Sequence, residues 1–232
     1  MSGNDVTKAL ASLKPFAGID AALLSALAGQ AMMMRLPRGA IIFDQGETPT
    51  AQVILVEGIV HLSGRIGEGP EMLIESVLPP DFLLPAAVLE ESPYLLRARA
   101  VTACRLLLVP ATSLRSAVAI EPSLALGLLS CLARQFRRMT RQVKNLKLRT
   151  TTERLACFLL DLAERQKTKV ITLPYDKGAV AAELGMTRES LSRAFASLAT
   201  DAIDVQGLEI SIHDRAALLR RCRVDALIDG PP

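Results

Sequence analysis

The chain has 232 residues, of which 50% are hydrophobic and 22% charged, so it can bury a core in more than one unit. Aromatic residues make up only 3%, which argues against carbohydrate platforms and against single-strand nucleic-acid binders built on stacked rings. The two histidines, His61 and His213, are too few for a His-based metal centre. No apolar run reaches the roughly 20 residues of a membrane span and no signal peptide is visible, so no membrane partner is expected.

The four cysteines show no close spacing along the chain. They are Cys104, Cys131, Cys157 and Cys222. Such spacing is typical of neither a zinc finger nor a disulfide framework, and it suits a protein of the reducing cytoplasm. No nucleophile with its base and no phosphate loop can be identified, so we do not expect an enzyme.

The net charge of +3 is unevenly distributed. Residues 1–120 carry 9 basic and 11 acidic side chains, whereas residues 121–232 carry 18 and 13. Within the second part, the stretch from Arg134 to Arg149 holds seven basic residues and no acidic one. This asymmetry predicts that the second half meets an anionic partner, with a solvated helix face as the alternative.

The first half changes texture near Leu36. Residues 4–35 have apolar side chains at three- and four-residue spacings and are predicted to be helical, with breaks at Pro15 and Gly18. After Leu36, short apolar runs alternate with Gly and Pro, which predicts a compact antiparallel barrel or roll. The expected strands are Ala40–Phe43, Gln52–Val56, Ile59–Leu62, Met72–Val77, Arg99–Val101 and Arg105–Val109. A short helix is expected over Ser113–Ile120.

A long helix is predicted to begin near Pro122, because Pro is tolerated in a first helical turn. Its apolar residues repeat at spacings of four and three, the a/d pattern of helices that pair along a narrow stripe. The seam residues are Ala125, Leu129, Leu132, Phe136, Met139, Val143 and Leu146. We therefore predict a homodimer formed along this helix; an amphipathic helix packed on its own domain is the alternative.

The long helix is expected to end near residue 149, since Thr150-x-x-Glu153 has the form of a capping box that starts a new helix. Residues 170–223 then read as strand, helix, turn, helix, hairpin and helix. A helix-turn-helix needs a small residue where its helices touch, a glycine in the turn and an apolar residue where the second helix packs. These are Ala181, Gly185 and Leu191. The expected wing consists of Ile203–Val205, the turn Gln206-Gly207 and Leu208–Ile212.

The second helix of this unit, from Arg188 to about Ala199, is expected to enter the major groove of double-stranded DNA with its first residues foremost. Arg188 and Arg193 can each donate two hydrogen bonds to a guanine edge, and Glu189 can accept one from a cytosine amino group. Auxiliary contacts to phosphates or bases are expected from Lys177, Thr187, Ser190 and Ser192.

Over essentially its full length, the chain resembles the CRP/FNR family of bacterial transcription regulators. The stretch Gly185-Met-Thr-Arg-Glu-Ser-Leu-Ser-Arg193 is similar to that family's recognition helix. The segments Leu173-Pro-Tyr-Asp-Lys177 and Ser192-Arg-Ala-Phe195 are similar to their counterparts in the family. In the first half, the residues similar to the family's cyclic-nucleotide-type β-roll are Gly39, Phe43, Asp44, Gln45, Gly46, Gly58 and the stretch Val56-Glu-Gly-Ile-Val60.

The resemblance implies an α+β fold in three parts. These are an antiparallel β-roll (double-stranded β-helix or jelly-roll) sensor domain over residues 1–121, a long dimerisation helix over 122–149 and a winged helix-turn-helix domain over 150–232. It also implies a cytoplasmic homodimer, a pseudo-palindromic operator, contacts with RNA polymerase as in an activator, and an unidentified small-molecule effector. Arg188, Glu189 and Arg193 match the family's base-reading positions, with the CRP-type and the FNR-type half-site both open.

The effector pocket departs from the family's cyclic-AMP version. In that version a Gly-Glu pair follows Asp-Phe, and an Arg precedes a Ser/Thr-Ala pair. Here Pro85 replaces the Glu and the Arg position falls near Tyr94, so a buried cyclic phosphate would lack its cation. Cyclic AMP binding is therefore not expected. The other candidates for an effector site, through a rearranged anion site or contact with the long helix, are Arg97, Arg99, Met139, Thr140 and His61.

No cofactor is required by this sequence. An iron–sulfur sensor needs clustered cysteines near the start of the chain, whereas the first here is Cys104. A haem that senses nitric oxide stays open, with His61 and Met32–Met34 as candidate ligands, and so does a nucleotide-responsive regulatory module without DNA binding. An effector is expected to shift a hinge around Arg149–Thr152 and so to change the spacing of the two recognition helices.

Overall fold

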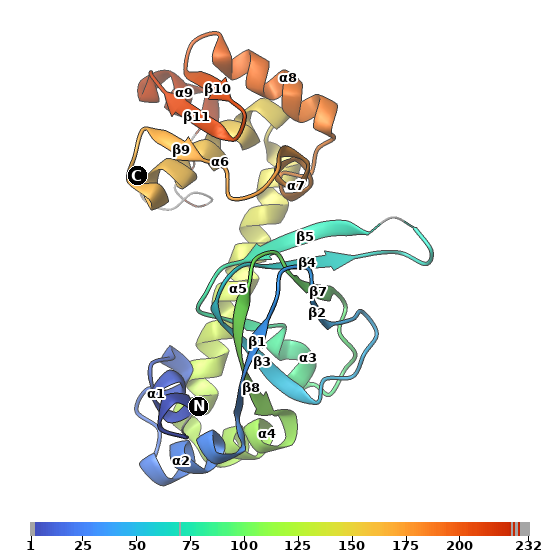
Figure 1. The fold of residues 1–232 in the computed structure, drawn as a ribbon, viewed down its shortest axis with the longest axis vertical. Helices are drawn as coiled ribbons and strands as arrows, with labels where there is room; N and C mark the ends of the chain where they lie inside the picture. The colour runs from blue at the N-terminus through green and yellow to red at the C-terminus, as the bar shows by residue number, and fades with distance from the viewer. Residues whose placement is uncertain (1–2, 70, 224, 226, 228–232) are drawn as a thin grey trace. The chain divides into compact units, whose positions relative to one another are not determined.

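The computed structural model describes residues 3–69, 71–223, 225 and 227 (Figure 1). The chain divides into two compact units, Met1–Phe136 and Arg137–Pro232. The long helix α5 (Pro122–Leu148) begins within the first unit's residues and ends within the second's. Its bounds agree with the helix that the sequence predicts between Pro122 and residue 149.

None of the described helices alone is long and apolar enough to cross a membrane; only α4 (Ala111–Ile120) and α5 taken together, across a bend of 115°, reach such a length and composition.

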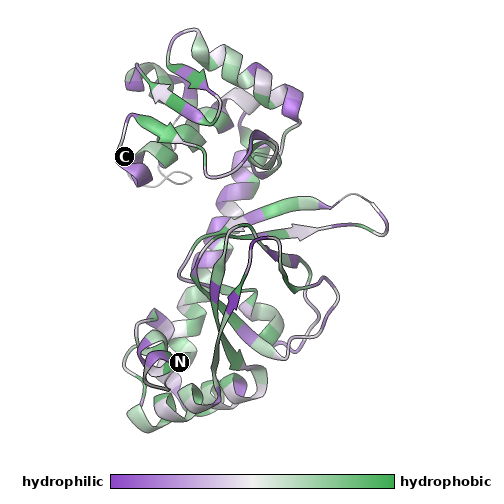
Figure 2. Cartoon of the chain, viewed as in Figure 1, coloured by the Kyte–Doolittle hydropathy of each residue, from purple (hydrophilic) through white to green (hydrophobic). Residues whose placement is uncertain are grey.

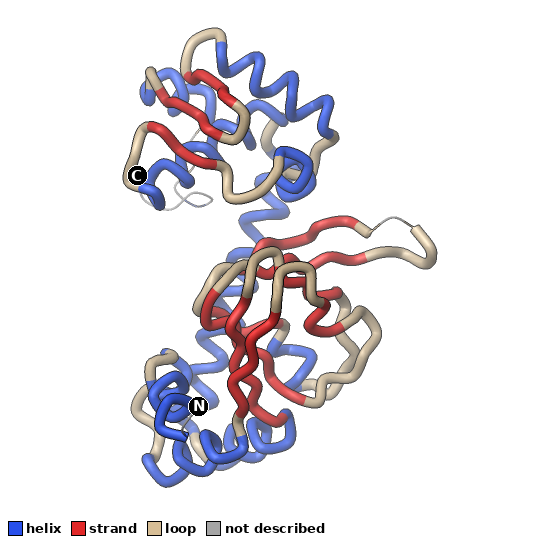
Figure 3. The backbone as a smooth tube through the Cα atoms, viewed as in Figure 1, coloured by secondary structure: helices blue, strands red, loops and turns tan. Residues whose placement is uncertain are grey.

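Two antiparallel sheets form the roll of the first unit, each built from four of the described strands (Figure 3). The first sheet has the order β1 (Met32–Leu36), β8 (Cys104–Pro110), β3 (Ala51–Glu57) and β6 (Asp81–Leu83). The second has the order β2 (Ile41–Phe43), β7 (Arg97–Ala100), β4 (Val60–Gly64) and β5 (Met72–Val77). The antiparallel roll predicted from the Gly- and Pro-punctuated runs is confirmed.

Strand β3 contributes to two hydrophobic cores because its side chains alternate between the faces of the sheet. Val53 and Leu55 pack inside the roll, in the same cluster as Phe43. Ile54, between them, packs with residues of the helices, among them Leu114. The first sheet is therefore apolar on both faces.

The helices of the first unit pack on the outer face of the first sheet. They are α1 (Gly3–Ala11), the 3-10 turn η1 (Lys14–Phe16), α2 (Ala21–Gln30), α4 and the first turns of α5, while α3 (Pro85–Leu89) follows β6. The sequence predicts helix up to residue 35, and this is wrong for residues 32–35, which belong to β1. Pairing with β8, a partner more than 60 residues away in the chain, decides this segment against its local spacing.

The second unit holds the predicted order of strand, helix, turn, helix, hairpin and helix. Its elements are α6 (Thr151–Gln166), β9 (Val170–Thr172), α7 (Lys177–Glu183), α8 (Arg188–Ala199), β10 (Ile203–Gln206), β11 (Glu209–Ile212) and α9 (Arg215–Cys222). The capping box is present: Thr150 N–H donates to Glu153 Oε2 (2.7 Å), and Glu153 N–H donates to Thr150 Oγ1 (3.3 Å). The wing hairpin turns at Gly207, whose φ is +62°.

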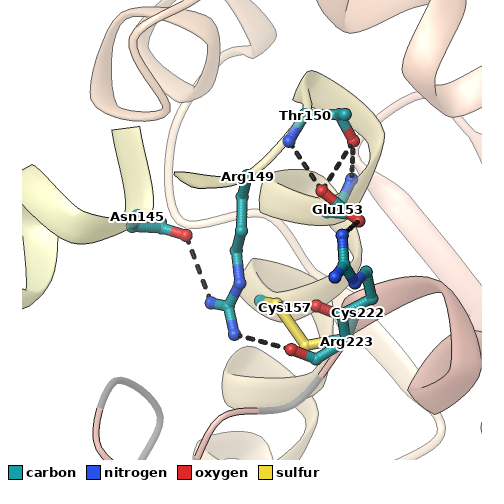
Figure 4. The surroundings of a disulfide bond; sticks show 7 residues. All are labelled: Asn145, Arg149, Thr150, Glu153, Cys157, Cys222 and Arg223. Carbon is teal, nitrogen blue, oxygen red and sulfur yellow. Dashed lines mark hydrogen bonds and ion pairs between the residues drawn. A yellow bond between two sulfur atoms is a disulfide. The ribbon is translucent and has the colours of Figure 1, made fainter. Parts of the chain in front are cut away.

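A disulfide bond joins Cys157 on α6 to Cys222 at the end of α9 (Figure 4). The expectation of a chain without a disulfide framework therefore needs correction. The two cysteines are 65 residues apart in sequence, but α6 packs against α9 and brings their Cα atoms to 4.9 Å. Cys104 and Cys131 are buried and lie outside the disulfide.

Candidate nucleic-acid interface

Both helices of the helix-turn-helix begin with a side-chain cap. Asp176 Oδ1 accepts hydrogen bonds from the N–H groups of Gly178 (2.8 Å) and Ala179 (3.1 Å) at the start of α7. Thr187 Oγ1 accepts one from the N–H of Ser190 (3.2 Å) at the start of α8. These caps satisfy N–H groups that the first turn of a helix leaves unpaired, so they determine where each helix begins.

The turn between α7 and α8 requires glycine for two reasons. Gly185 has a φ of +61°, and a Cβ atom at this position would lie 2.4 Å from Cδ2 of Leu146 in the last turn of α5. Ala181 and Leu191, which are 2% and 1% exposed, pack between the two helices. The three positions predicted for a helix-turn-helix are therefore confirmed.

The first turns of α8 face solvent. The predicted base-reading residues Arg188, Glu189 and Arg193 are all exposed. Figure 2 shows the start of α8 in the purple of hydrophilic residues. Of the predicted auxiliary residues, Thr187 and Ser192 are exposed, whereas Lys177 and Ser190 are half-buried. The exposed side chains supply both the donors and the acceptor that base edges in a major groove can pair with.

Glu189 is kept ionised by its neighbours. Its pKa is lowered by hydrogen bonds from its own backbone N–H and from the Thr187 side chain, and the charges of Arg193 and Arg188 act in the same direction. An ionised carboxylate only accepts hydrogen bonds, which suits a cytosine amino group and excludes donation to a guanine edge. Arg193 Nη2 donates to Ser190 Oγ (3.3 Å), which orients the guanidinium along the exposed face of α8.

A cavity of about 350 Å³ opens between α7 and α8. Its lining residues are Asp176, Lys177, Gly178, Arg188, Leu191, Ser192 and Phe195. Lys177 Nζ lies 5.2 Å from the centroid of the Phe195 ring, and a Cβ atom on Gly178 would lie 2.5 Å from Arg188 Nη2. Two cations, Lys177 and Arg188, and one carboxylate, Asp176, therefore line this cavity.

The predicted seam of α5 is exposed for most of its length. Leu124, Leu128 and Cys131, on the neighbouring stripe of the helix, are 0%, 1% and 3% exposed. The large seam residues are instead exposed: Leu129 61%, Phe136 73%, Met139 54%, Val143 46% and Leu146 40%, with Ala125 and Leu132 half-buried. Helix α5 therefore carries two apolar stripes, one buried in its own unit and one open.

The interior of the roll is filled by the protein's own side chains where the resemblance places a nucleotide. Tyr94, near the expected phosphate-binding Arg, is 4% exposed and stacks on Phe43 with ring centroids 3.8 Å apart. Its hydroxyl donates to the carbonyl of Ala51 (3.4 Å), and burial, together with the charge of Glu47, raises the pKa of Tyr94 to about 12. Pro85, at the position of the expected Glu, is buried as well. Neither position offers a cation or a carboxylate to a cyclic nucleotide.

The predicted effector residues of the roll lie on its outer face. His61 on β4 pairs with Arg99 on β7, and Arg97 lies two residues further along the same face. Arg97 donates to both carboxylate oxygens of Asp44 (2.9 and 2.6 Å) and to Glu71 (2.8 Å), so its charge is already compensated. These hydrogen bonds lower the pKa of the Asp44 carboxyl.

The other predicted effector residues are not part of this group. Met139 and Thr140 belong to the second unit. Met32–Met34 lie on β1 in the first sheet, whereas His61 lies on β4 in the second, so the structure does not bring the candidate haem ligands together.

Two buried arginines at the junction of α5 and α6 were missed by the sequence reasoning. Arg154 is 7% exposed, and its guanidinium donates to the carbonyls of Leu146 (3.3 Å), Arg149 (2.8 Å) and Gly185 (3.3 Å). Burial lowers the pKa of Arg154. Arg149 is 8% exposed. Arg149 is the last residue of the basic stretch that begins at Arg134, and Arg154 follows it on α6, so nothing in the local sequence indicates that these two arginines are buried.

Two family models match the chain, one in each unit. The cyclic nucleotide-binding domain matches residues 33–121, and the Crp-like helix-turn-helix domain matches residues 153–221. The first match coincides with the roll, and the second with the helices and sheet that carry the exposed start of α8.

Similar proteins extend over most of the chain. The CRP-like cAMP-activated global transcriptional regulator of Mycobacterium tuberculosis is 29% identical over 214 residues, which are 90% of this chain and 96% of the relative. The nitrogen fixation regulation protein FixK of Azorhizobium caulinodans is 28% identical and covers 79% of this chain and 76% of its own. The solved structure of FixK2 from Bradyrhizobium japonicum matches with a TM-score of 0.70 at 26% identity, over 82% of this chain and 96% of that chain.

The similarity includes both domains, because the alignment with the mycobacterial regulator spans nine tenths of the chain. Both curated relatives carry the names of regulators. The roll that precedes a Crp-like helix-turn-helix therefore identifies the chain as a member of the CRP/FNR family of DNA-binding transcription regulators.

Proposed function

We propose that the protein is a homodimeric, effector-responsive regulator that reads a pseudo-palindromic operator in double-stranded DNA. The observation that carries this proposal is the exposure of Arg188, Glu189 and Arg193 at the start of α8, on a helix whose apolar side is buried in the core of its unit. A recognition helix placed in the major groove by its first residues needs exposure of this kind.

Dimerisation along α5 is supported by its open stripe. Five large apolar residues, led by Phe136 at 73%, are exposed at a/d positions, and contiguous apolar surface of this sort marks an interaction site. We propose a second copy of the chain as the occupant. The heptad spacing is that of two helices that pair lengthwise, and a twofold pair of recognition helices matches a palindromic site.

The proposal assigns three functional parts: a roll over residues 1–121 that senses the effector, a dimerisation helix over 122–149 and a DNA-binding domain over 150–232. The protein would act in the cytoplasm and contact RNA polymerase as its relatives' role in transcription suggests. Transcription in vitro, with purified polymerase and an operator placed upstream of a promoter, tests this partner.

We further propose that cyclic AMP is not the effector. The stacking of Tyr94 on Phe43 and the buried Pro85 support this, since a nucleotide phosphate would find no cation at these positions. The chain would then differ in effector from its cAMP-activated mycobacterial relative while sharing its fold. Haem is the remaining alternative from the sequence, although His61 and Met32–Met34 lie on different sheets. An absorption spectrum of protein purified with haem supplied tests it.

The proposed function is tested by selecting duplexes from a random-sequence pool with the full chain. We expect the enriched duplexes to be pseudo-palindromic and to bind two chains each. The logarithm of the binding constant should fall linearly with the logarithm of the salt concentration, with a slope of about −0.9 for each phosphate contact. A scrambled duplex is the control. Failure to enrich any sequence, or an affinity that does not change with salt, would contradict the proposal.

A further inference from the structure

The disulfide between Cys157 and Cys222 lies beside the junction between α5 and α6 (Figure 4). Cys157 is half-buried on the second turn of α6, and Cys222, at the end of α9, is 2% exposed. The bond therefore ties the last residue of α9 to the helix that begins directly after the junction. Within this unit, it joins two segments that the chain itself separates by 65 residues.

The residue after Cys222 is held to the junction through its backbone. Arg149 Nη2 donates to the carbonyl of Arg223 (3.1 Å), while Arg149 Nη1 donates to Asn145 Oδ1 on α5 (3.2 Å). Arg149 is 8% exposed, and a guanidinium buried to this degree needs such acceptors. The carbonyl of Arg223 is therefore one of the acceptors that this buried charge has at the junction.

The side chain of Arg223 is held to the junction as well. Its Nη1 pairs with Glu153 Oε1 (3.3 Å), and Glu153 also accepts the hydrogen bond from Thr150 N–H that begins α6. The Thr150 backbone hydrogen bond, and to a lesser degree the Arg223 guanidinium, lower the pKa of Glu153. Figure 4 shows Arg149 and Glu153 reaching Arg223 from two sides, next to the disulfide.

The same junction contacts the turn of the helix-turn-helix. Arg154, three residues before Cys157 on α6, donates to the carbonyls of Leu146 and Arg149 and to that of Gly185. Leu146 also lies against Gly185, since a Cβ there would be 2.4 Å from its Cδ2. The end of α5 is thus joined on one side to the turn before α8 and on the other to the segment that the disulfide anchors.

We propose that Cys157 and Cys222 form a thiol–disulfide switch that controls how firmly the α5–α6 junction holds the DNA-binding unit. This rests on the proposed function, because its output is DNA affinity. In the oxidised state the bond keeps Arg223 in place for Arg149 and Glu153. In the reduced state the end of α9 is released, the junction loses these partners, and a dimer no longer holds its two recognition helices at one fixed spacing.

The chemistry is exchange with a dithiol reductant. One thiolate of the reductant attacks Sγ of the half-buried Cys157, the Cys157–Cys222 bond breaks, and Cys222 leaves as a thiolate that takes up a proton. The second thiol of the reductant then displaces Cys157, which also leaves as a thiol. Two electrons and two protons pass to the cysteine pair, and the reductant becomes a disulfide. A disulfide oxidant of the same class reverses the reaction.

A switch role fits this bond better than a permanent staple for two reasons. Disulfides in a reducing compartment, where we place this regulator, are mostly transient and redox-sensing. The other two cysteines are unsuited to exchange: Cys104 and Cys131 are buried and lie outside the disulfide, and burial raises the pKa of the Cys104 thiol. A redox change would therefore act at one place in the chain.

The test uses the full chain in buffers of graded dithiol-to-disulfide ratio. Three quantities are measured in each buffer: the free thiols that a maleimide labels, the amide hydrogen exchange of residues 145–155, and the affinity for a duplex that the oxidised protein has selected from a random pool. On reduction we expect two more labelled thiols per chain, loss of amide protection at the junction, and affinity weaker by about tenfold, a typical size for coupling between sites.

Two variants serve as controls. The double variant Cys157→Ser/Cys222→Ser should behave as the reduced protein in every buffer. The double variant Cys104→Ala/Cys131→Ala keeps the pair and should retain the full redox response. Because the wild-type chain is itself titrated, the test stands even if a variant folds poorly.

Equal affinity and equal protection in both redox states would overturn the proposal. A loss of affinity when dithiol is added to the Cys157→Ser/Cys222→Ser variant would also overturn it, because this variant has no Cys157–Cys222 bond to reduce. Failure of the proposed function would look different. The protein would then select no duplex in either state, while loss of protection at residues 145–155 on reduction would still support the switch at the junction.

Discussion

The roll and the DNA-binding unit use charged side chains in opposite ways. In the roll, Arg97 is bound by two carboxylates, Asp44 and Glu71. In the DNA-binding unit, Arg188, Glu189 and Arg193 are exposed at one end of α8. The contacts described for the two arginines lie within the helix-turn-helix. The first arrangement joins three separate segments of the roll, and the second leaves hydrogen-bonding groups available to a partner.

The largest effect is expected where the open stripe of α5 is altered. Phe136→Glu would place one carboxylate from each chain in the predicted apolar seam. We therefore expect the dimer dissociation constant to rise by about a hundredfold or more, measured by sedimentation. Leu126→Glu is the matched control, since Leu126 is 64% exposed on the same helix but lies outside the seam. A stable Phe136→Glu dimer, or equal dissociation of both variants, would contradict pairing along this stripe.

The next effect concerns the turn that joins the junction to α8. Gly185→Ala should destabilise the DNA-binding unit by roughly 2–4 kcal/mol, because it adds a clash with Leu146 to the cost of a positive φ. Gly207→Ala, at a φ of +62° with no atom within 4 Å of the added Cβ, carries the backbone cost alone, about 1 kcal/mol. Thermal or urea unfolding of both variants gives the difference, and similar losses would mean that Leu146 moves aside freely.

A smaller effect is expected at the DNA interface itself. Arg193→Ala should weaken binding to the selected duplex by about 1–3 kcal/mol and relax the base preference at one position of each half-site. Arg165→Ala is the control, because Arg165 is exposed on α6 and pairs with Asp161. The measurement is the affinity ratio between the selected duplex and duplexes altered at single positions. A ratio that Arg193→Ala leaves unchanged would remove this residue from base reading.

No effect at all is expected from cyclic AMP. A nucleotide at a hundred times its dissociation constant would add about 2.7 kcal/mol to stability, which calorimetry readily detects as a rise in Tm. With Tyr94 stacked on Phe43, we expect the Tm of this chain to stay constant. The cAMP-activated mycobacterial relative is the positive control. A clear rise would contradict this expectation and would show that the stacking of Tyr94 on Phe43 does not prevent cyclic AMP from binding.

The sequence predicted best what local chemistry decides. The capping residues Asp176 and Thr187, Gly185 in the turn and the a/d repeat of α5 each act within a few residues, so the helix-turn-helix and the long helix follow from them. The exposure of the base-reading residues follows in turn from the position of Leu191, since the buried side of a helix determines its opposite side.

Features that depend on distant partners were not predictable in this way. Met32–Leu36 is a strand only because β8 lies beside it. Cys157 finds Cys222 only after α6 and α9 have packed, and Arg154 is buried only because three carbonyls converge on it. The stacking of Tyr94 on Phe43 also depends on a distant partner. The sequence shows that the expected Arg is absent near Tyr94, but it does not show that Tyr94 stacks on Phe43.

Strand β3 lies between two hydrophobic cores, one inside the roll and one under the helices that include the first turns of α5. Val53 and Leu55 touch one side, and Ile54 touches the other. A slip of β3 by a single residue would move each of these side chains to the opposite face of the sheet, so both cores fix its register. Because protein interiors are close-packed, a molecule that enlarges the roll from within would displace the first sheet outwards. The helices packed on its outer face, including the start of α5, would then shift with it.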